Sequence, residues 1–191
     1  ALQLSLNVRA IVLLDRVGAS RLSARLKQAG GTLILPKDET PGLAMGLGGV
    51  GVTLTDLTSL YAGIARGGTT MRLRERMDET RGEGDGRRLL DRVAAWQVGN
   101  VLLGTPPPDN AVRNRIAFKT GTSYGYRDAW SVGFDGRMTI GVWVGRPDGA
   151  PVPGMLGRTA AAPVLFDAFA RSGKLPAPLP APPKGVLVAA N

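Results

Sequence analysis

The strongest constraint on the fold is a change in residue pattern near residue 105. Before this point, apolar residues recur at helical spacing in segments 3–16, 20–30, 53–66 and 87–103. After it, the segments 115–123, 126–134 and 138–146 are rich in β-branched and aromatic residues, which is typical of strands. A last helix is predicted at 158–172. The pattern predicts an α/β domain of the α+β type, with a helical region, antiparallel strands and a C-terminal helix.

Capping and turn residues mark where these elements begin and end. Ser20 is the predicted N-cap of the second helix, and Thr53 or Thr55 that of the third. Gly173 follows the last helix and is a typical C-terminal stop. Asp135-Gly136 separates the last two strands, and this dipeptide is a strong signal for a hairpin.

The composition limits the chemistry. The chain has neither Cys nor His, which excludes disulfides, thiolate and imidazole metal ligands, and imidazole bases. Any general base is then Lys, Asp, Glu or a hydroxyl relay. No metal and no cofactor is assigned to this chain.

The formal net charge is +9, which by itself would suit a polyanionic partner such as nucleic acid, an anionic bilayer or a wall polymer. Acidic residues interrupt the densest basic run, 72–92, and aromatic residues make up only 5% of the chain. This arrangement favours a solvated excursion over a nucleic-acid surface. No apolar stretch is long enough to span a bilayer, and residues 1–20 do not resemble a signal peptide. If the parent protein is anchored, we expect its anchor outside this chain.

The segment Lys119-Thr120-Gly121-Thr122-Ser123 carries the most chemical information. It ends an apolar strand and combines a cation, hydroxyl groups and a residue without a side chain. On a strand, Lys119 and Gly121 share a face, and the glycine allows another extended backbone to approach closely. A substrate carboxylate could then be bound beside the strand edge, as in β-augmentation. Taken alone, the tripeptide Lys-Thr-Gly is also compatible with a strand that simply runs into a turn.

The surrounding sequence resembles the transpeptidase domain of class A penicillin-binding proteins, and most strongly their 1C subgroup. Residues 118–149 are similar to the strand, loop and hairpin around the family's third motif, Lys-Thr-Gly. Residues 42–68 resemble part of its helical region, and 157–169 resemble its last helix. The resemblance covers most of residues 1–173. It implies part of the serine β-lactamase and penicillin-binding transpeptidase fold.

Within this resemblance, Ser5-Leu6-Asn7 falls where the family's second motif, Ser-x-Asn, is expected. The implied role of Ser5 is proton relay, with its hydroxyl between Lys119 and the lysine of the first motif. Asn7 would orient that lysine and the amide carbonyl of the substrate. Without the family context, Ser5 could equally be a helix-capping or solvent-facing hydroxyl.

The resemblance also implies how a substrate would be bound. Lys119 would attract the terminal carboxylate of a D-Ala-D-Ala stem peptide, and Thr120 and Thr122 would donate hydrogen bonds to it. The Thr122 amide would form half of an oxyanion hole. The implied reaction is acyl transfer through a serine ester, which an amine of a neighbouring stem peptide resolves into a cross-link. Penicillin would acylate the same serine.

The family's first motif, Ser-x-x-Lys, is missing. The residues three positions before the five lysines are Ala24, Ile34, Ile116, Arg171 and Ala181, so none of them is a serine. No nucleophile is therefore assigned in this chain, and the chain is expected to be inactive alone. We expect residues 1–173 to form a partial transpeptidase domain, which needs the remainder of the parent chain to complete its fold. Residues 174–191 are predicted to be a proline-rich linker to a further domain.

The resemblance implies a parent that cross-links peptidoglycan on the periplasmic side of the bacterial inner membrane, with a glycosyltransferase domain elsewhere. Its ligands would be stem peptides and β-lactams, not nucleic acid. Two alternatives stay open: a β-lactamase or carboxypeptidase of the same fold, and a non-catalytic module that binds wall peptides.

Three residues just beyond the third motif, Arg127, Asp128 and Trp130, have two interpretations. They could shape the acceptor side of a cleft, or they could be a salt-bridged strand end with Trp130 packed in the core, which the sequence favours. Val142 and Trp143 are assigned to packing.

Overall fold

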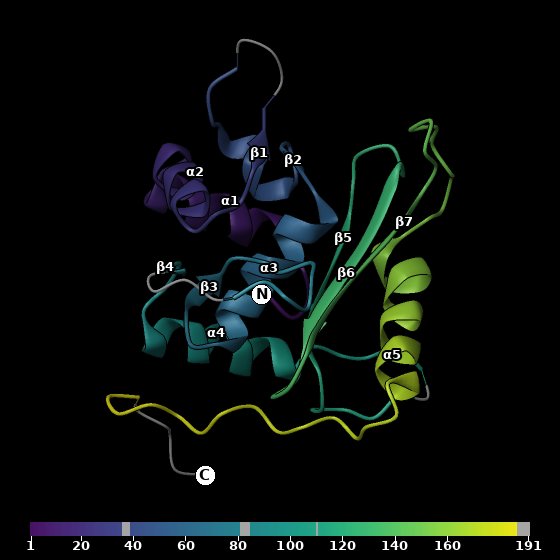
Figure 1. Cartoon of the computed structure of the whole chain (residues 1–191). Coiled ribbons are helices and arrows are strands. Elements are labelled where there is room, and N and C mark those ends of the chain that lie inside the picture. The colour runs from purple at the N-terminus through teal and green to yellow at the C-terminus, as the bar shows by residue number, and fades with distance from the viewer. Residues whose placement is uncertain (36–38, 81–84, 110, 187–191) are drawn as a thin grey trace.

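A three-stranded antiparallel sheet separates two groups of helices in the computed structural model (Figure 1). The structure describes residues 1–35, 39–80, 85–109 and 111–186. The sheet order is β5-β6-β7. Its strands are β5 (Ala117–Thr122), β6 (Asp128–Phe134) and β7 (Thr139–Gly145), which confirms the three predicted strands. One face carries α5 (Ala162–Arg171), and the opposite face carries α1 (Asn7–Val17), α2 (Ala19–Gln28), α3 (Leu54–Ala65) and α4 (Arg92–Leu103).

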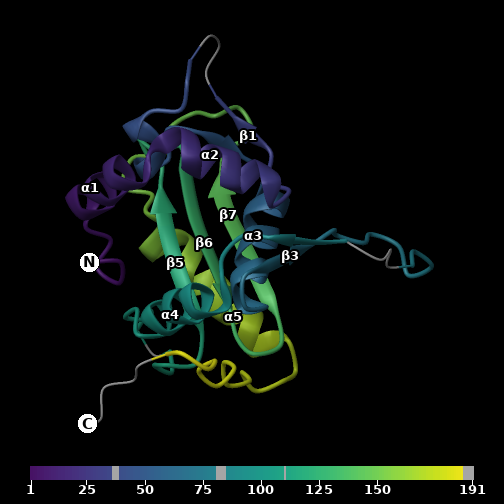
Figure 2. The same cartoon turned by 90° about the vertical axis from the view of Figure 1, so that its left-hand side faces the viewer.

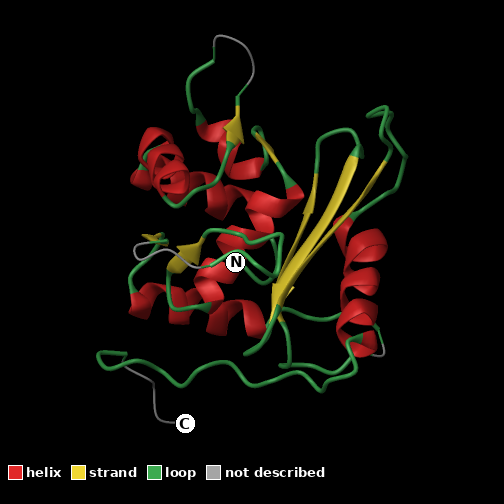
Figure 3. Cartoon of the chain, viewed as in Figure 1, coloured by secondary structure: helices red, strands yellow, loops and turns green. Residues whose placement is uncertain are grey.

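The remaining elements are short (Figure 3). Strands β1 (Leu33–Ile34) and β2 (Gly51–Val52) pair with each other, as do β3 (Thr69–Met71) and β4 (Gly86–Arg88). A 3₁₀ helix, η1 (Leu43–Leu47), precedes β2, and a π-helical turn, η2 (Gly157–Ala161), leads into α5. The predicted α+β character is confirmed, with small antiparallel sheets beside the helices.

Side-chain alternation along β5 divides the core into two layers. Phe118 packs against α5, where Leu165 and Phe169 are also buried. Ala117 points to the other face and packs with Leu102 of α4 and Phe134 of β6. Because successive residues alternate, Lys119 must emerge on the face of the helical region.

The capping signals of the sequence were partly correct. Thr53 caps α3, since its Oγ1 accepts a hydrogen bond from the amide of Asp56 at 3.0 Å. Ser20 does not cap α2, because the helix already begins at Ala19 and Gly18 is its N-cap residue, with φ 87°. Gly18 separates α1 from α2, and only its unusual backbone conformation allows one helix to follow so directly on another.

Two predicted helices start later than expected. The first starts at Asn7 rather than residue 3, because Ser5 has a left-handed φ of 55° and forms a turn. The fourth starts at Arg92, where Asp91 accepts a hydrogen bond from Ala94 N. Arg87 belongs instead to β4, paired with Thr70, so pairing with a distant strand overrode the helical pattern. The last helix of the prediction, 158–172, opens as the π-helical turn before α5.

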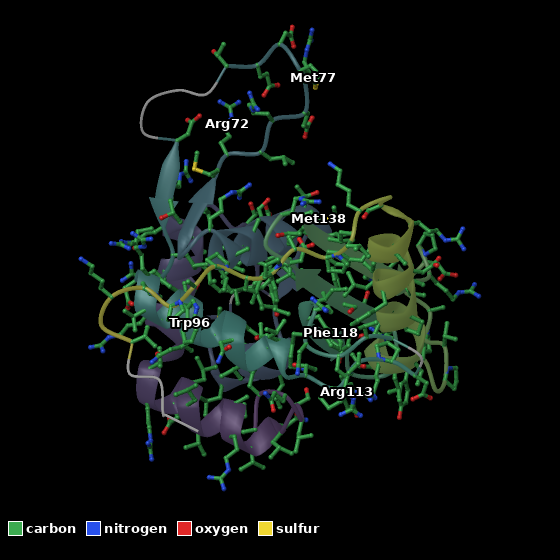
Figure 4. All side chains as sticks on the ribbon, turned by 90° about the horizontal axis from the view of Figure 1, so that it is seen from below. Arg72, Met77, Trp96, Arg113, Phe118 and Met138 are labelled. Atoms are coloured by element: carbon green, nitrogen blue, oxygen red, sulfur yellow. The ribbon has the colours of Figure 1, made fainter. Side chains whose placement is uncertain are left out.

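The hairpin of β3 and β4 extends away from the rest of the molecule (Figure 2). Met77 lies at its far end and is fully exposed (Figure 4). This excursion carries most of the basic run 72–92, of which residues 81–84 lie outside the described residues. Among the helices of the described ranges, none has the length and apolarity that crossing a membrane requires.

The segment that follows α5 lies along the body of the molecule. The Asp135 carboxylate accepts a hydrogen bond from Ala177 N at 2.9 Å, and Gly136 N donates to Ala177 O. Further along, Trp96 of α4 lies beside this segment (Figure 4), and its Nε1 donates to Pro180 O at 3.0 Å. Leu179 packs on the core. The first part of the predicted linker 174–191 is therefore anchored to the domain, while residues 187–191 lie outside the described residues.

Candidate active site

Lys119 and Ser5 meet at the edge of the sheet although 114 residues separate them in the chain. The Lys119 ammonium donates a hydrogen bond to Ser5 Oγ at 2.7 Å and another to Thr120 O at 2.7 Å. Lys119 is half-buried on the face of β5 that meets the helical region. The structure therefore brings together the cation and the hydroxyl that the sequence singled out.

The turn before α1 positions Ser5. Its backbone has φ 55°, which is uncommon for a residue with a side chain and is found often at functional sites. Ser5 N donates to Leu2 O, and Leu6 N donates to Ala1 O, so the turn is closed by its own backbone. Gln3 ties this turn to the end of α4, because its Nε2 donates to Val101 O at 2.8 Å. No local sequence signal marked Gln3, since its role depends entirely on this long-range contact.

Asn7 is the first residue of α1 and is exposed. It lies two residues after Ser5, so the Ser-x-Asn tripeptide spans the junction between the turn and the helix. Gly121 lies two residues after Lys119 on the same face of β5 and is exposed. A side-chain atom added there would meet only the Cβ of Trp130, at 3.7 Å, which is ordinary contact. The space above Gly121 is thus open to a ligand.

The outer edge of β5 presents backbone donors. Ser123 N donates to Asp128 O, so the amides that bond to β6 belong to odd-numbered residues. The amides of Thr120 and Thr122 therefore point to the opposite side, along the edge of the described sheet. A ligand lying along this edge would meet both amides in the manner of an added strand.

The hydroxyl of Thr122 has a structural partner. Thr122 Oγ1 accepts a hydrogen bond from Gly157 N at 2.9 Å, at the start of the π-helical turn η2. A hydroxyl can accept and donate at once, so this contact leaves the Thr122 O–H as a donor. The Gly157 position also requires glycine, because a Cβ would collide with backbone atoms of Gly121 and Trp130. Gly157 is thus a supporting residue that sequence reasoning did not single out.

Asp128 and Trp143 differ from the sequence prediction. Asp128 Oδ1 accepts a hydrogen bond from Trp143 Nε1 at 2.8 Å, whereas Arg127 precedes the first residue of β6. The favoured interpretation, a salt-bridged strand end, is therefore not the contact that Asp128 makes here. Val142 packs on the core as predicted. Trp143 was assigned to packing as well, but it is 36% exposed.

Partial burial changes the titration of the site, because desolvation lowers the pKa of Lys119 below the usual range of a lysine ammonium. If carboxylate binding requires the ammonium form, the affinity for a carboxylate ligand should decline as pH rises through this lowered pKa. Lys119→Arg keeps its charge at any pH reached by the assay, so we expect the alkaline decline to disappear or move upward. The measurement is the affinity for a short peptide with a free terminal carboxylate between about pH 7 and 11. An identical alkaline decline in both proteins would assign it to another group.

Among the residues that the structure describes, no group of three or more acidic side chains is placed to hold a metal ion.

Comparison with protein-family models finds no match. Three curated proteins are similar in sequence. The chain is 40% identical over 184 residues to penicillin-binding protein 1C of Escherichia coli. It is 31% identical over 167 residues to penicillin-binding protein 1B of Vibrio cholerae, and 30% identical over 163 residues to penicillin-binding protein 1A of Aquifex aeolicus. These alignments cover 92%, 79% and 76% of the chain. The chain is part of a class A penicillin-binding protein.

The chain spans only 24%, 21% and 21% of the lengths of these three class A proteins. The resemblance noted in the sequence, including that to the 1C subgroup, agrees with these identities.

Two solved structures share the fold. The crystal structure of penicillin-binding protein 1A from Haemophilus influenzae matches with a TM-score of 0.74 and 18% identity, over 96% of this chain and 35% of that chain. The crystal structure of a peptidoglycan glycosyltransferase from Burkholderia ambifaria matches with a TM-score of 0.67 and 20% identity, over 93% of this chain and 65% of that chain. At these identities the likeness describes the fold of this penicillin-binding protein segment and no more.

Proposed function

We propose that this chain is the C-terminal part of the transpeptidase domain of a peptidoglycan synthase, with Ser5, Asn7 and Lys119 in its catalytic machinery. The observation that carries the proposal is the 2.7 Å hydrogen bond between Lys119 Nζ and Ser5 Oγ. It joins the proposed second and third motifs of a penicillin-recognising site, on a sheet edge with outward-pointing amides. The parent protein would act on the periplasmic side of the inner membrane, with a glycosyltransferase domain outside this chain.

In the proposed reaction, a serine outside this chain attacks the carbonyl carbon between the two D-Ala residues of a stem peptide. The peptide C–N bond breaks, D-Ala leaves with the proton, and a serine ester remains. Lys119 and the hydroxyls of Thr120 and Thr122 bind the terminal carboxylate before this step. The Thr122 amide, which points outward from β5, stabilises the oxyanion. An acceptor amine then attacks the ester, forming a new C–N bond as the serine oxygen regains a proton.

Intact-mass spectrometry after incubation with a β-lactam tests this assignment. We expect a covalent adduct on the parent polypeptide and none on the 191-residue chain, because the nucleophile lies outside it. An adduct on the chain itself would identify Ser5 or another serine such as Ser123 as the nucleophile, and the motif assignment would be wrong. No adduct on either protein would favour a non-catalytic module that binds wall peptides. Among acylated products, slow release would favour a transpeptidase, and rapid hydrolysis would favour a β-lactamase.

Ser5→Ala in the parent polypeptide tests directly whether the hydrogen bond between Lys119 and Ser5 contributes to the reaction. Loss of a proton relay typically costs about 10²- to 10⁴-fold in rate, and we expect the acylation rate to fall by at least the lower figure. Ser20→Ala is the matched control, because Ser20 is an exposed serine of α2 outside the site. Equal acylation rates for the two variants would remove Ser5 from the mechanism.

The likeness to a peptidoglycan glycosyltransferase from Burkholderia ambifaria raises a second candidate, in which this segment takes part in glycosyl transfer. The two candidates predict different losses for Lys119→Ala. If the segment belongs to a transpeptidase, the variant loses penicillin acylation and keeps glycan polymerisation. The opposite pattern of losses would establish the second candidate.

A further inference from the structure

A second group of side chains lies on the same sheet face as Lys119. The strand register places Gly121, Trp130 and Trp143 directly opposite one another on three adjacent strands. Gly121 lies two residues after Lys119 on β5, so the two share a sheet face. Trp130 and Trp143 share that face too, because directly paired residues of neighbouring strands point to the same side. With strands about 4.8 Å apart, Trp143 lies on the order of 10 Å across the sheet from Gly121. The two indole rings therefore lie on the same sheet face as a ligand bound at Lys119.

The indole of Trp143 is held in one orientation. It lies over Gly145, where a Cβ would collide with the ring, so only glycine leaves room for it. Its Nε1 donates to Asp128 Oδ1 at 2.8 Å, across the pair formed by Asp128 and Gly145. Trp130 contacts it edge to face, with ring centroids 6.5 Å apart and an angle of 62°. Trp143 nevertheless remains 36% exposed, so part of the fixed ring is accessible.

This arrangement suits a cation. An accessible indole face attracts an ammonium group through the ring quadrupole, and tryptophan is the strongest side chain for this interaction. The Asp128 carboxylate adds a negative charge beside the ring, and its hydrogen bond to the indole uses only one of about four lone-pair sites. The site near Lys119 attracts anions, whereas this group attracts cations. The same sheet face thus presents two binding regions, one that attracts anions and one that attracts cations.

We infer that Trp143, with Asp128 and Trp130, forms a binding subsite for the primary ammonium of the acceptor peptide. The inference rests on the proposed transpeptidase function. The subsite acts on binding: it holds the acceptor as its ammonium ion, which gives one proton to solvent water before the free amine attacks the ester. These three residues are positioning residues, and their loss raises the acceptor concentration needed for cross-linking more than it lowers the maximal rate.

The test uses the parent polypeptide with a donor peptide that ends in D-Ala-D-Ala and an acceptor peptide that carries a primary amine. The measured quantity is the ratio of cross-linked to hydrolysed donor as a function of acceptor concentration. We expect Trp143→Leu, which keeps apolar bulk but has no ring, to raise the half-saturating acceptor concentration about tenfold. Trp143→Phe keeps a weaker ring and should raise it about threefold. Asp128→Asn keeps an acceptor for the indole but removes the charge, and should also raise it several-fold.

A matched acceptor separates this role from a structural one. The same peptide with a hydroxyl in place of the amine has no positive charge at that position. Its half-saturating concentration should therefore be the same in wild type and Trp143→Leu. Equal effects of Leu and Phe on both acceptors would show that Trp143 only supports the fold, and unchanged ratios in every variant would also overturn the subsite. If the wild-type parent formed no penicillin adduct at all, the transpeptidase proposal itself would fail.

Discussion

Lys119→Ala is expected to lower the rate at which benzylpenicillin acylates the parent polypeptide by about 10²- to 10³-fold, the usual loss when one preorganised electrostatic group is removed from an active site. Lys119 is half-buried and contacts Ser5 Oγ at 2.7 Å, so its deletion removes both the charge for the carboxylate and the partner of the hydroxyl. A partly desolvated charge interacts more strongly than an exposed one. The measurement is the second-order acylation rate constant, followed with a fluorescent penicillin.

The matched controls for this variant are Lys27→Ala and Lys174→Ala, which remove lysines outside the site. Both should acylate within about twofold of wild type, because exposed surface charges contribute little. Lys119→Arg restores charge with a different shape, and we expect it to recover part of the rate. A Lys119→Ala protein that acylates as fast as the controls would disprove the carboxylate-binding role.

Phe118→Ala is expected to reduce the free energy of unfolding of the domain by about 3 to 5 kcal/mol, the range for removing a buried phenylalanine. Phe118 is 1% exposed, next to Lys119, and it contacts Phe166 of α5 edge to face at 5.0 Å. Its loss would leave a cavity between the sheet and α5, which Figure 4 shows side by side. In a domain of this size the melting temperature should fall by about 10 °C.

Thermal unfolding of the parent polypeptide, monitored at the transition that bound penicillin stabilises, measures this effect. Val164→Ala is the matched control, since Val164 lies on α5 but is 49% exposed, and its replacement should change stability by less than about 0.5 kcal/mol. If Phe118→Ala and Val164→Ala had the same melting temperature, α5 would not be packed on β5 as in this structure.

Local sequence was sufficient for the strands but not for all the helix ends. The Asp135-Gly136 turn joins β6 and β7 as predicted, and Asp135 Oδ1 accepts hydrogen bonds from Arg137 N and Met138 N. These contacts join residues at most three positions apart, so the local sequence alone encodes them. Arg87 has an equally local helical pattern, yet it pairs with Thr70 in β3. Strand pairing depends on a partner in another segment of the chain, which no window of helical periodicity contains.

The candidate site shows the same division. The residue types at Ser5 and Lys119 could be singled out from the sequence because hydroxyl and ammonium groups have definite hydrogen-bonding chemistry. Their 2.7 Å contact could not, because it depends on the left-handed turn at Ser5 and on the tie between Gln3 and Val101. Likewise, Trp143 is an ordinary strand aromatic in the sequence. Its position opposite Trp130 follows only from the register of β6 and β7.

By itself, the sequence determined the types of the five main helices and three long strands, the alternation that puts Lys119 and Gly121 on one face, and the absence of Cys and His chemistry. These properties depend on neighbouring residues or on composition. The tertiary structure alone decided that Ser5 meets Lys119, that Asp128 binds the indole of Trp143 rather than Arg127, and that residues 177–180 lie along the domain. The physical reason is that contacts between distant segments depend on how whole elements pack, and packing is a property of the complete fold.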